Sequence, residues 1–256
     1  MTALLAAGCA LVGLAVGSFL NVVVHRVPRK ESVVSPRSRC PGCGMQLAPR
    51  DNIPVVSWLL LRGRCRTCQQ PISPRYPLVE LATAVLFAAV ALRLGADWAL
   101  PGFLIVVAGL VAISAVDLER FIVPNRILYP TLFIAAPLLI LAAAVDGDWS
   151  GARTSALGGV MAWGLLLTIH LISPKGMGFG DVRLAGLIGM MLGWLSLGHV
   201  LVGLFLGFLT ASMVGVGLIL AGRRGRKDRV PFGPFLAAGA VLAVLFGRPI
   251  LSWYGV

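Results

Sequence analysis

The chain contains few charged side chains for its length. Only 12% of its 256 residues are Asp, Glu, Lys or Arg, whereas 58% are hydrophobic. A soluble domain is about a quarter charged. The composition therefore excludes a soluble domain and indicates a polytopic membrane protein.

Histidine and acidic residues are also scarce, with three His and ten Asp or Glu in the chain. His25, His170 and His199 are scattered, so the sequence favours neither a Ser–His nor a Cys–His catalytic arrangement. A carboxylate beside lipid is costly, and such a residue is a functional-site candidate by default. Asp117 and Asp181 meet this description, because each lies at the edge of a long apolar run.

Apolar runs long enough to cross a bilayer, about 17–25 residues each, recur along the chain. The first run is followed by basic residues and preceded by none, so we expect a retained helix rather than a cleaved signal peptide. The largest polar insert is 25–77. We expect about eight transmembrane helices, at 3–24, 78–95, 98–116, 128–145, 152–173, 182–197, 199–221 and 232–252.

The basic residues predict the orientation in the membrane. With the N-terminus outside, every Lys and Arg except Arg93, Arg153 and Arg248 falls in an inner segment, as the positive-inside rule requires. This distribution explains most of the net charge of +12 without a nucleic-acid partner. We expect one basic run to contact anionic lipid, namely Arg223, Arg224, Arg226, Lys227 and Arg229.

In this orientation both aspartates and the polar insert lie at the cytosolic face. Two close carboxylates can share one proton, so that the ionised one deprotonates water while the protonated one polarises a scissile carbonyl. The alternative is that each is an ordinary helix-end residue. Asp181 would then be an N-cap, and Asp117 would pair with Arg120.

Three glycines precede the second aspartate in the string GMGFGD. Gly176, Gly178 and Gly180 leave the backbone bare, which permits close approach of another chain. We therefore expect an extended substrate strand to lie against this segment.

The polar insert carries two C-x-x-C pairs, formed by Cys40 with Cys43 and Cys65 with Cys68. Pairs at about this separation are typical of a tetrahedral zinc site. Two disulfides are the alternative, which a cytosolic loop disfavours. Because four thiolates fill the coordination sphere, the expected role of zinc is structural. Cys9, inside the first span, is expected to be a packing residue.

Several strings together resemble one family, the bacterial type IV prepilin peptidases of the bifunctional kind, which belong to the G-x-G-D aspartyl proteases. Apart from the cysteine pairs, these strings are GSFLNVVVHRVP at 17–28, DNIPVVSWLLLRGRC at 51–65, ISPRYPLVEL at 72–81, D-x-x-x-x-x-x-P-N at 117–125 and GMGFGDVRL at 176–184. The resemblance covers nearly the whole chain in the family's order.

The resemblance implies an enzyme of the bacterial inner membrane. It would cleave the basic leader from type IV prepilins or type II secretion pseudopilins at the cytoplasmic face and methylate the new N-terminus with S-adenosylmethionine. Asp117 and Asp181 match the family's catalytic aspartates, and the four cysteines match its zinc-binding domain. The implied division is 1–24 as the first helix, 25–77 as the zinc-binding, methyltransferase-associated domain and 78–256 as the protease domain.

The chain departs from the family's pattern at two positions. Arg183 replaces a common lysine, and Gln69 replaces a common glycine. Two polar residues at inner helix ends have open roles. Glu80 would contact the new amino group or the methyl donor, or else form an ion pair with an arginine such as Arg75. Asn21 would line the site or bond between helices. The alternative function is an ion-coupled membrane transporter with the aspartates as ion ligands.

Overall fold

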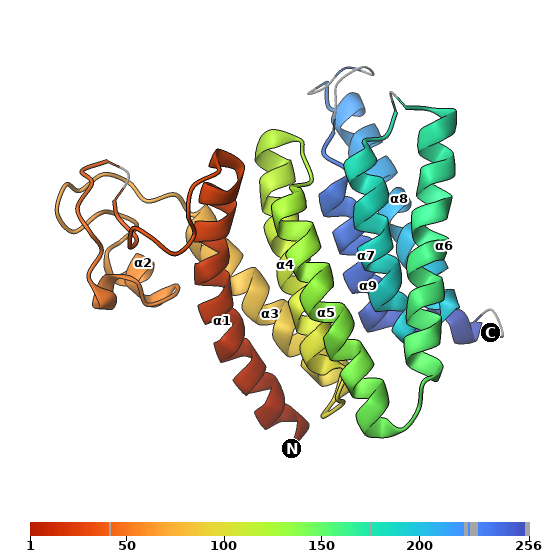
Figure 1. Cartoon of the computed structure of the whole chain (residues 1–256). Coiled ribbons are helices and arrows are strands. Elements are labelled where there is room, and N and C mark those ends of the chain that lie inside the picture. The colour runs from red at the N-terminus through yellow and green to blue at the C-terminus, as the bar shows by residue number, and fades with distance from the viewer. Residues whose placement is uncertain (41, 175, 223–224, 226–229, 254–256) are drawn as a thin grey trace. The chain divides into compact units, whose positions relative to one another are not determined.

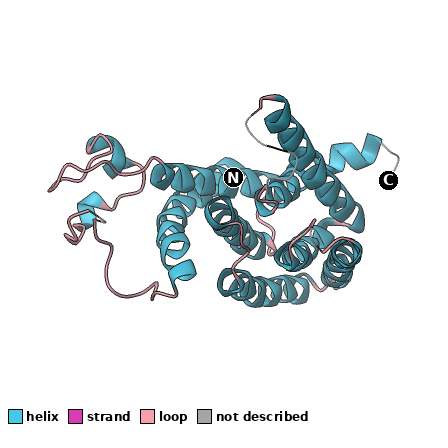
Figure 2. Ribbon diagram, turned by 90° about the horizontal axis from the view of Figure 1, so that it is seen from above, coloured by secondary structure: helices cyan, strands magenta, loops and turns pink. Residues whose placement is uncertain are grey.

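The computed structural model describes residues 1–40, 42–174, 176–222, 225 and 230–253. It divides into two compact units, Met1–Leu92 and Arg93–Val256. The basic side chains Arg223, Arg224, Arg226, Lys227 and Arg229 lie outside the described residues. Within the described ranges the secondary structure is helical and contains no strand (Figure 2).

The N-terminal unit consists of long helices and a cysteine-containing loop domain. Helix α1 and helix α3 lie side by side (Figure 1) and pack closely at two glycines. A Cβ atom on Gly17 would lie 2.6 Å from the Cα of Glu80, and one on Gly13 would lie 2.7 Å from the Cα of Ala84. Small residues at such crossings let membrane helices approach closely. The elements are α1 (Thr2–Arg26), η1 (Val27–Arg29), η2 (Pro49–Asp51), α2 (Val56–Leu60) and α3 (Arg75–Leu94).

The C-terminal unit is a bundle of long helices joined by short connections. Its elements are α4 (Leu100–Arg120), α5 (Asn125–Asp146), α6 (Ser150–Ile172), α7 (Phe179–Leu195), α8 (Leu197–Leu220) and α9 (Gly233–Trp253). Helices α6 and α7 run side by side (Figure 1) and touch at glycines, since a Cβ atom on Gly189 would lie 2.2 Å from the carbonyl oxygen of Gly158. The buried centre of α7 includes Leu187, Ile188 and Met191.

Seven helices of the described chain are long and apolar enough to cross a membrane. They are all the long helices except α7, which has 17 residues and so lies at the lower limit of a bilayer span. The expected all-α, multi-pass membrane fold is therefore confirmed. About eight spans were expected, and the structure has seven clear ones with α7 as a shorter eighth helix.

Candidate active site and metal centre

Asp117 lies in the last turn of α4 and is 4% exposed. Its Oδ2 accepts a hydrogen bond of 2.9 Å from the backbone N–H of Gly233, the first residue of α9. A side chain at position 233 would place its Cβ 2.9 Å from the same oxygen, so this contact requires glycine. Among the described residues, Asp117 forms no ion pair with Arg120, whose side chain is exposed.

Asp181 lies in the first turn of α7, whose N-cap is Gly178. Its backbone N–H donates to Gly178 O at 3.1 Å, and its Oδ2 lies 3.3 Å from the place that a Cβ on Gly178 would take. Asp181 is therefore not the N-cap itself but a residue of the first helical turn. Its side chain is partly exposed.

Both aspartates line one cavity of about 280 Å³ in the C-terminal unit. The cavity is formed where α4 ends and where α5 and α7 begin, and its walls include Asn125, Gly178, Gly180 and Arg183. The structure thus brings together, at one cavity, two carboxylates that are far apart in the sequence.

Arg183 forms part of the cavity wall. Its guanidinium donates a hydrogen bond to Oδ1 of Asn125 and lies 4.7 Å from the centre of the Phe179 ring. The planar guanidinium can stack on an aromatic ring and bond an amide oxygen at once, which the compact lysine ammonium does not do as well. The substitution of the family's common lysine is therefore accommodated by contacts between α7 and the start of α5.

The glycines before Asp181 have different surroundings. Gly178 is exposed within the cavity lining. Gly180 packs against the α4–α5 connection, because a Cβ there would lie 2.9 Å from the Cβ of Val123. Gly176 lies against Ser173, whose Oγ would be 2.9 Å from an added Cβ. A Cβ on Gly178 would lie 3.3 Å from Oδ2 of Asp181, so the neighbour of this exposed backbone is the candidate catalytic carboxylate itself.

Sequence reasoning missed two features of this site. One is Gly233, which follows the Pro-Phe pair at 231–232 immediately before the last apolar run. The other is the bond between Arg183 and Asn125. The Pro-Asn pair indicated a helix start, but a sequence pattern does not show which side chain meets it from another helix.

The four cysteines of the N-terminal unit form one cluster. Their Sγ atoms all lie within 4.8 Å of one another, and those of Cys40 and Cys68 are 3.7 Å apart. Four thiolates bound tetrahedrally at about 2.3 Å would have neighbouring sulfurs about 3.8 Å apart. All are free thiols rather than disulfides. The donor set and its geometry therefore fit a tetrahedral metal ion.

The two C-x-x-C turns have the same local backbone. In the first turn the N–H of Cys40 donates to Met45 O and the N–H of Gly44 donates to Cys40 O, both at 2.9 Å. In the second, the N–H of Cys65 donates to Gln70 O at 2.9 Å, and that of Gln69 to Cys65 O at 3.0 Å. Gly44 has φ +70° and Gln69 has φ +58°.

The amides of the second turn also act on a thiol. Hydrogen bonds from the backbone N–H groups of Cys68 and Thr67 lower the pKa of the Cys65 thiol to about 6. A lower pKa favours the thiolate, which is the form that coordinates metal. The C-x-x-C turn therefore prepares its first cysteine for binding.

An ion pair ties the second turn to the rest of the loop domain. Arg66 Nη2 lies 2.7 Å from Asp51 Oδ1, and Arg66 Nε lies 3.1 Å from both carboxylate oxygens. Hydrogen bonding to Arg66 lowers the pKa of Asp51 and raises the pKa of Arg66. The contact fixes the second C-x-x-C turn against η2.

Glu80 and Asn21 hold the loop domain and the α1–α3 pair together. Glu80 is 7% exposed, and its Oε2 accepts a hydrogen bond of 2.7 Å from the N–H of Val55. Val55 has φ +60°, which is strained for a β-branched residue. Asn21 donates from Nδ2 to Tyr76 O at 3.0 Å, a bond between the two helices. Both side chains are thus engaged in the fold.

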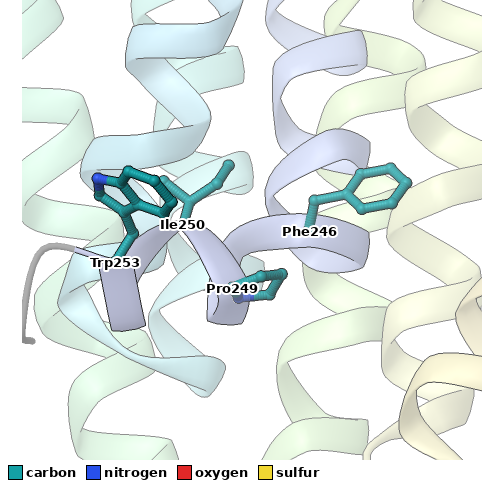
Figure 3. A pocket seen from close by; sticks show the side chains of 4 residues that line it. All are labelled: Phe246, Pro249, Ile250 and Trp253. Carbon is teal, nitrogen blue, oxygen red and sulfur yellow. The ribbon is translucent and has the colours of Figure 1, made fainter.

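A second hollow lies on the last turns of α9 and is larger, at about 530 Å³. Figure 3 shows its lining, with Phe246 on one side of Pro249 and with Ile250 and Trp253 on the other. These side chains carry no titratable group. Its lining therefore offers no group for acid–base catalysis.

The fold and the cavity together define a multi-pass membrane protein with a paired-carboxylate site. Residues 11–94 match the family model of the bacterial peptidase A24 N-terminal domain, and residues 104–220 match that of the type IV leader peptidase family. No solved structure matches this chain.

Similar curated proteins bear the name prepilin leader peptidase/N-methyltransferase. That of Aeromonas hydrophila is 38% identical, over 95% of this chain and 91% of the relative. That of Bacillus subtilis is 36% identical, over 94% of each, and that of Pseudomonas aeruginosa is 34% identical, over 95% and 91%. The chain therefore belongs to the type IV leader peptidase family, and the resemblance noted in the sequence is confirmed.

Proposed function

We propose that this protein is a membrane aspartyl endopeptidase that removes the basic leader from type IV prepilins or pseudopilins, and that Asp117 and Asp181 are its catalytic residues. The observation that carries the proposal is that both carboxylates line one cavity. The relatives' shared name supports the substrate class. The transporter alternative has no support in the relatives.

Peptide hydrolysis at this site needs no group beyond the two carboxylates and water. The pair shares one proton, so the ionised carboxylate takes a proton from water while the protonated one donates a hydrogen bond to the scissile carbonyl. The hydroxide adds to the carbonyl carbon, and the departing nitrogen takes a proton from the pair. The products are a leader with a new carboxylate and a mature chain with a new amine.

The surroundings of the pair suit this chemistry. The Gly233 amide holds the Asp117 carboxylate in one orientation. Gly178 provides bare backbone at the exposed part of the cavity lining, where an extended substrate strand can approach. Gly180 and Gly176 support this segment by packing internally.

The proposed location is the bacterial inner membrane, with the N-terminus outside. The distribution of basic residues supports this orientation. An N-terminus outside would put the loop domain and the carboxylate cavity at the cytosolic face, where the basic leader of a prepilin remains. The lipid bilayer and the prepilin are the proposed partners, and nucleic acid is not.

We further propose that Cys40, Cys43, Cys65 and Cys68 hold a structural zinc ion. The distances between the Sγ atoms and the reduced thiols support this assignment. With four thiolates as ligands, zinc would stabilise the loop domain, because metal binding and folding are coupled in such small domains.

The relatives' name also supports N-methylation of the new N-terminus, with S-adenosylmethionine as the methyl donor. We assign no residue to the methyl donor. Glu80 was a candidate, but its carboxylate accepts the Val55 amide. A role in the loop domain's attachment to α3 accounts for its burial.

The peptidase proposal is tested with Asp117→Asn and Asp181→Asn, assayed on a prepilin-like peptide in detergent. Each variant should lose cleavage by about 10⁴-fold, because loss of one member of a catalytic unit typically removes most of its effect. Asp148→Asn, in the exposed α5–α6 connection, is the matched control and should cleave normally. Intact cleavage in both site variants would sink the assignment.

The methyltransferase proposal is tested by transfer of labelled methyl from S-adenosylmethionine to the cleaved peptide. Cys40→Ser should lose bound zinc, measured by elemental analysis, and should lose methyl transfer while retaining cleavage. Cys9→Ser, which changes a cysteine outside the cluster, should retain zinc and both activities. Methyl transfer by zinc-free protein would separate that activity from the cysteine domain.

A further inference from the structure

Arg93, Arg153 and Arg248 are the basic residues that the positive-inside distribution does not explain. The structure brings two of them together. Arg93 at the end of α3 and Arg248 near the end of α9 act electrostatically on each other and on His199 in the first turn of α8. The boundary between the two units falls inside α3, after Leu92, so Arg93 belongs to the C-terminal unit together with His199 and Arg248. Like charges therefore gather at the membrane edge opposite the carboxylate cavity.

His199 is held rigidly at this point. It is 4% exposed. The Oγ of Ser196, which caps α8, accepts the backbone N–H of His199 at 3.2 Å and lies 2.7 Å from its Nδ1. The imidazole packs on α9, because a Cβ on Gly247 would lie 2.9 Å from Nε2. Nε2 is thus fixed beside the residue that precedes Arg248.

One ring nitrogen of the imidazole has no partner in the chain as described. The Ser196 Oγ accepts one bond from the backbone and lies 2.7 Å from Nδ1, and the tautomer decides which of these two atoms donates. With the Ser196 hydroxyl as the donor, the ring proton of a neutral imidazole lies on Nε2. Nε2 is buried and has no partner among the described residues.

Arg93 also has a buried nitrogen without a hydrogen-bond partner. Its Nη2 is buried and lacks an acceptor in the described part of the chain. A guanidinium does not release its proton in proteins, so this donor stays charged. Neither Asp97 nor Asp148 forms an ion pair with Arg93; Asp97 accepts the Ala99 amide at 2.7 Å and Asp148 accepts the Ser150 amide at 2.8 Å. The one ion pair found within the described ranges joins Arg66 and Asp51.

A buried donor of a charged guanidinium, such as Arg93 Nη2, is costly beside lipid unless an anion meets it, and the buried His199 Nε2 is a second polar atom without a partner in the described ranges. We propose that Arg93, Arg248 and His199 form a binding site for a phosphate group, which in a bilayer is the headgroup phosphate of an anionic phospholipid. The guanidinium fork matches the geometry of phosphate oxygens, and Nε2–H supplies a further donor. The site is independent of the peptidase proposal.

The test uses the full-length protein in nanodiscs of phosphatidylcholine, with and without phosphatidylglycerol. Two quantities are measured: the midpoint of thermal unfolding, and the amount of phosphatidylglycerol that the protein retains in native mass spectrometry. Wild-type protein should be stabilised by phosphatidylglycerol and should retain it. Arg248→Gln, at an exposed position where folding is not at risk, should retain about tenfold less, since one charge-assisted hydrogen bond is lost. The double variant with Arg93→Gln should lose the lipid-dependent shift.

The matched control is Arg153→Gln. This variant removes the same charge from the same side, but Arg153 acts on Asp148 and donates to Trp149 O rather than joining the cluster. It should keep the wild-type lipid response. A third arm adds inorganic phosphate to phosphatidylcholine nanodiscs. A phosphate-dependent shift that the double variant loses would assign the site to the free anion.

Two outcomes would overturn the proposal. One is an equal response of the wild type and the double variant to both phosphatidylglycerol and phosphate. The other is loss of the response in Arg153→Gln to the same extent as in Arg248→Gln, which would show a diffuse surface charge effect.

Discussion

The left-handed residue in each C-x-x-C turn leads to a quantitative prediction about metal binding. Gly44 and Gln69 follow the second cysteine of their turns, with φ +70° and φ +58°. This conformation costs a residue with a side chain about 1–2 kcal/mol but costs glycine little. Gln69→Gly should therefore relieve strain in the folded loop domain.

The net effect is smaller than the strain alone. Glycine also gives the unfolded chain more freedom, which opposes the gain by about 0.4–1 kcal/mol. Gln69→Gly should thus stabilise the domain by about 0.5–1 kcal/mol, and Gly44→Ala should destabilise it by a similar amount. No heavy atom lies within 4 Å of a Cβ added at Gly44, so this second change isolates the backbone cost.

Zinc affinity reports these changes, because binding and folding of the loop domain are coupled. Competition with a chromogenic chelator on the full-length protein should show affinity about two- to fivefold higher for Gln69→Gly and lower by a similar factor for Gly44→Ala. Gln46→Gly is the control, since Gln46 is not among the residues with positive φ. Weaker binding by Gln69→Gly would contradict the backbone explanation.

Three further changes test other contacts. Gly233→Ala should slow prepilin cleavage by roughly 10²-fold, because its Cβ would displace the Asp117 carboxylate and small misplacements in a catalytic site cost about this much; a normal rate would show that this contact does not position Asp117. Glu80→Leu should lower the free energy of unfolding by about 1–3 kcal/mol by leaving the Val55 amide unpaired, whereas Glu80→Gln should retain most of it; equal losses would refute the hydrogen-bond explanation. Asp51→Asn should cost less than about 1 kcal/mol, since Arg66 is half exposed. Because Arg66 lowers the folded-state pKa of Asp51, this contribution should be fully present above the unfolded pKa of about 4 and should be lost progressively as the pH falls from there through the lower folded-state pKa. Unfolding measured at pH 6 and pH 3 should show a smaller effect of Asp51→Asn at pH 3.

The helices were predictable from the sequence because apolar runs are interrupted by proline, glycine and charge. The expected span at 128–145 became α5, Asn125–Asp146, and the expected end near 116 became Arg120 in α4. The shortest of the long helices, α7, could not be distinguished from a full span, because its apolar run continues into α8 with only Ser196 between them. An apolar side chain indicates that a position is shielded from water, but it does not show whether the neighbours of that position are lipid or other helices.

The candidate site was only partly predictable. The positions of Asp117 and Asp181 at helix ends and on one predicted face followed from charge patterning, but their presence in a common cavity depends on how α4 and α7 pack. The cysteine cluster was predictable, because the four ligand residues are themselves visible in the sequence as two C-x-x-C pairs. The Gly233 amide and the Asn125 side chain carry no such signal, since any glycine or asparagine at a helix start has the same local pattern.

The bond between Gly233 and Asp117 makes the last helix part of the candidate site. The amide at the start of α9 is satisfied by a carboxylate 116 residues earlier in the chain, in the place where a helix normally receives a cap from its own neighbouring residues. The match to the type IV leader peptidase family ends at residue 220. A protein truncated at that boundary would keep both aspartates and lose the contact that orients one of them, so we expect the smallest working peptidase to include α9.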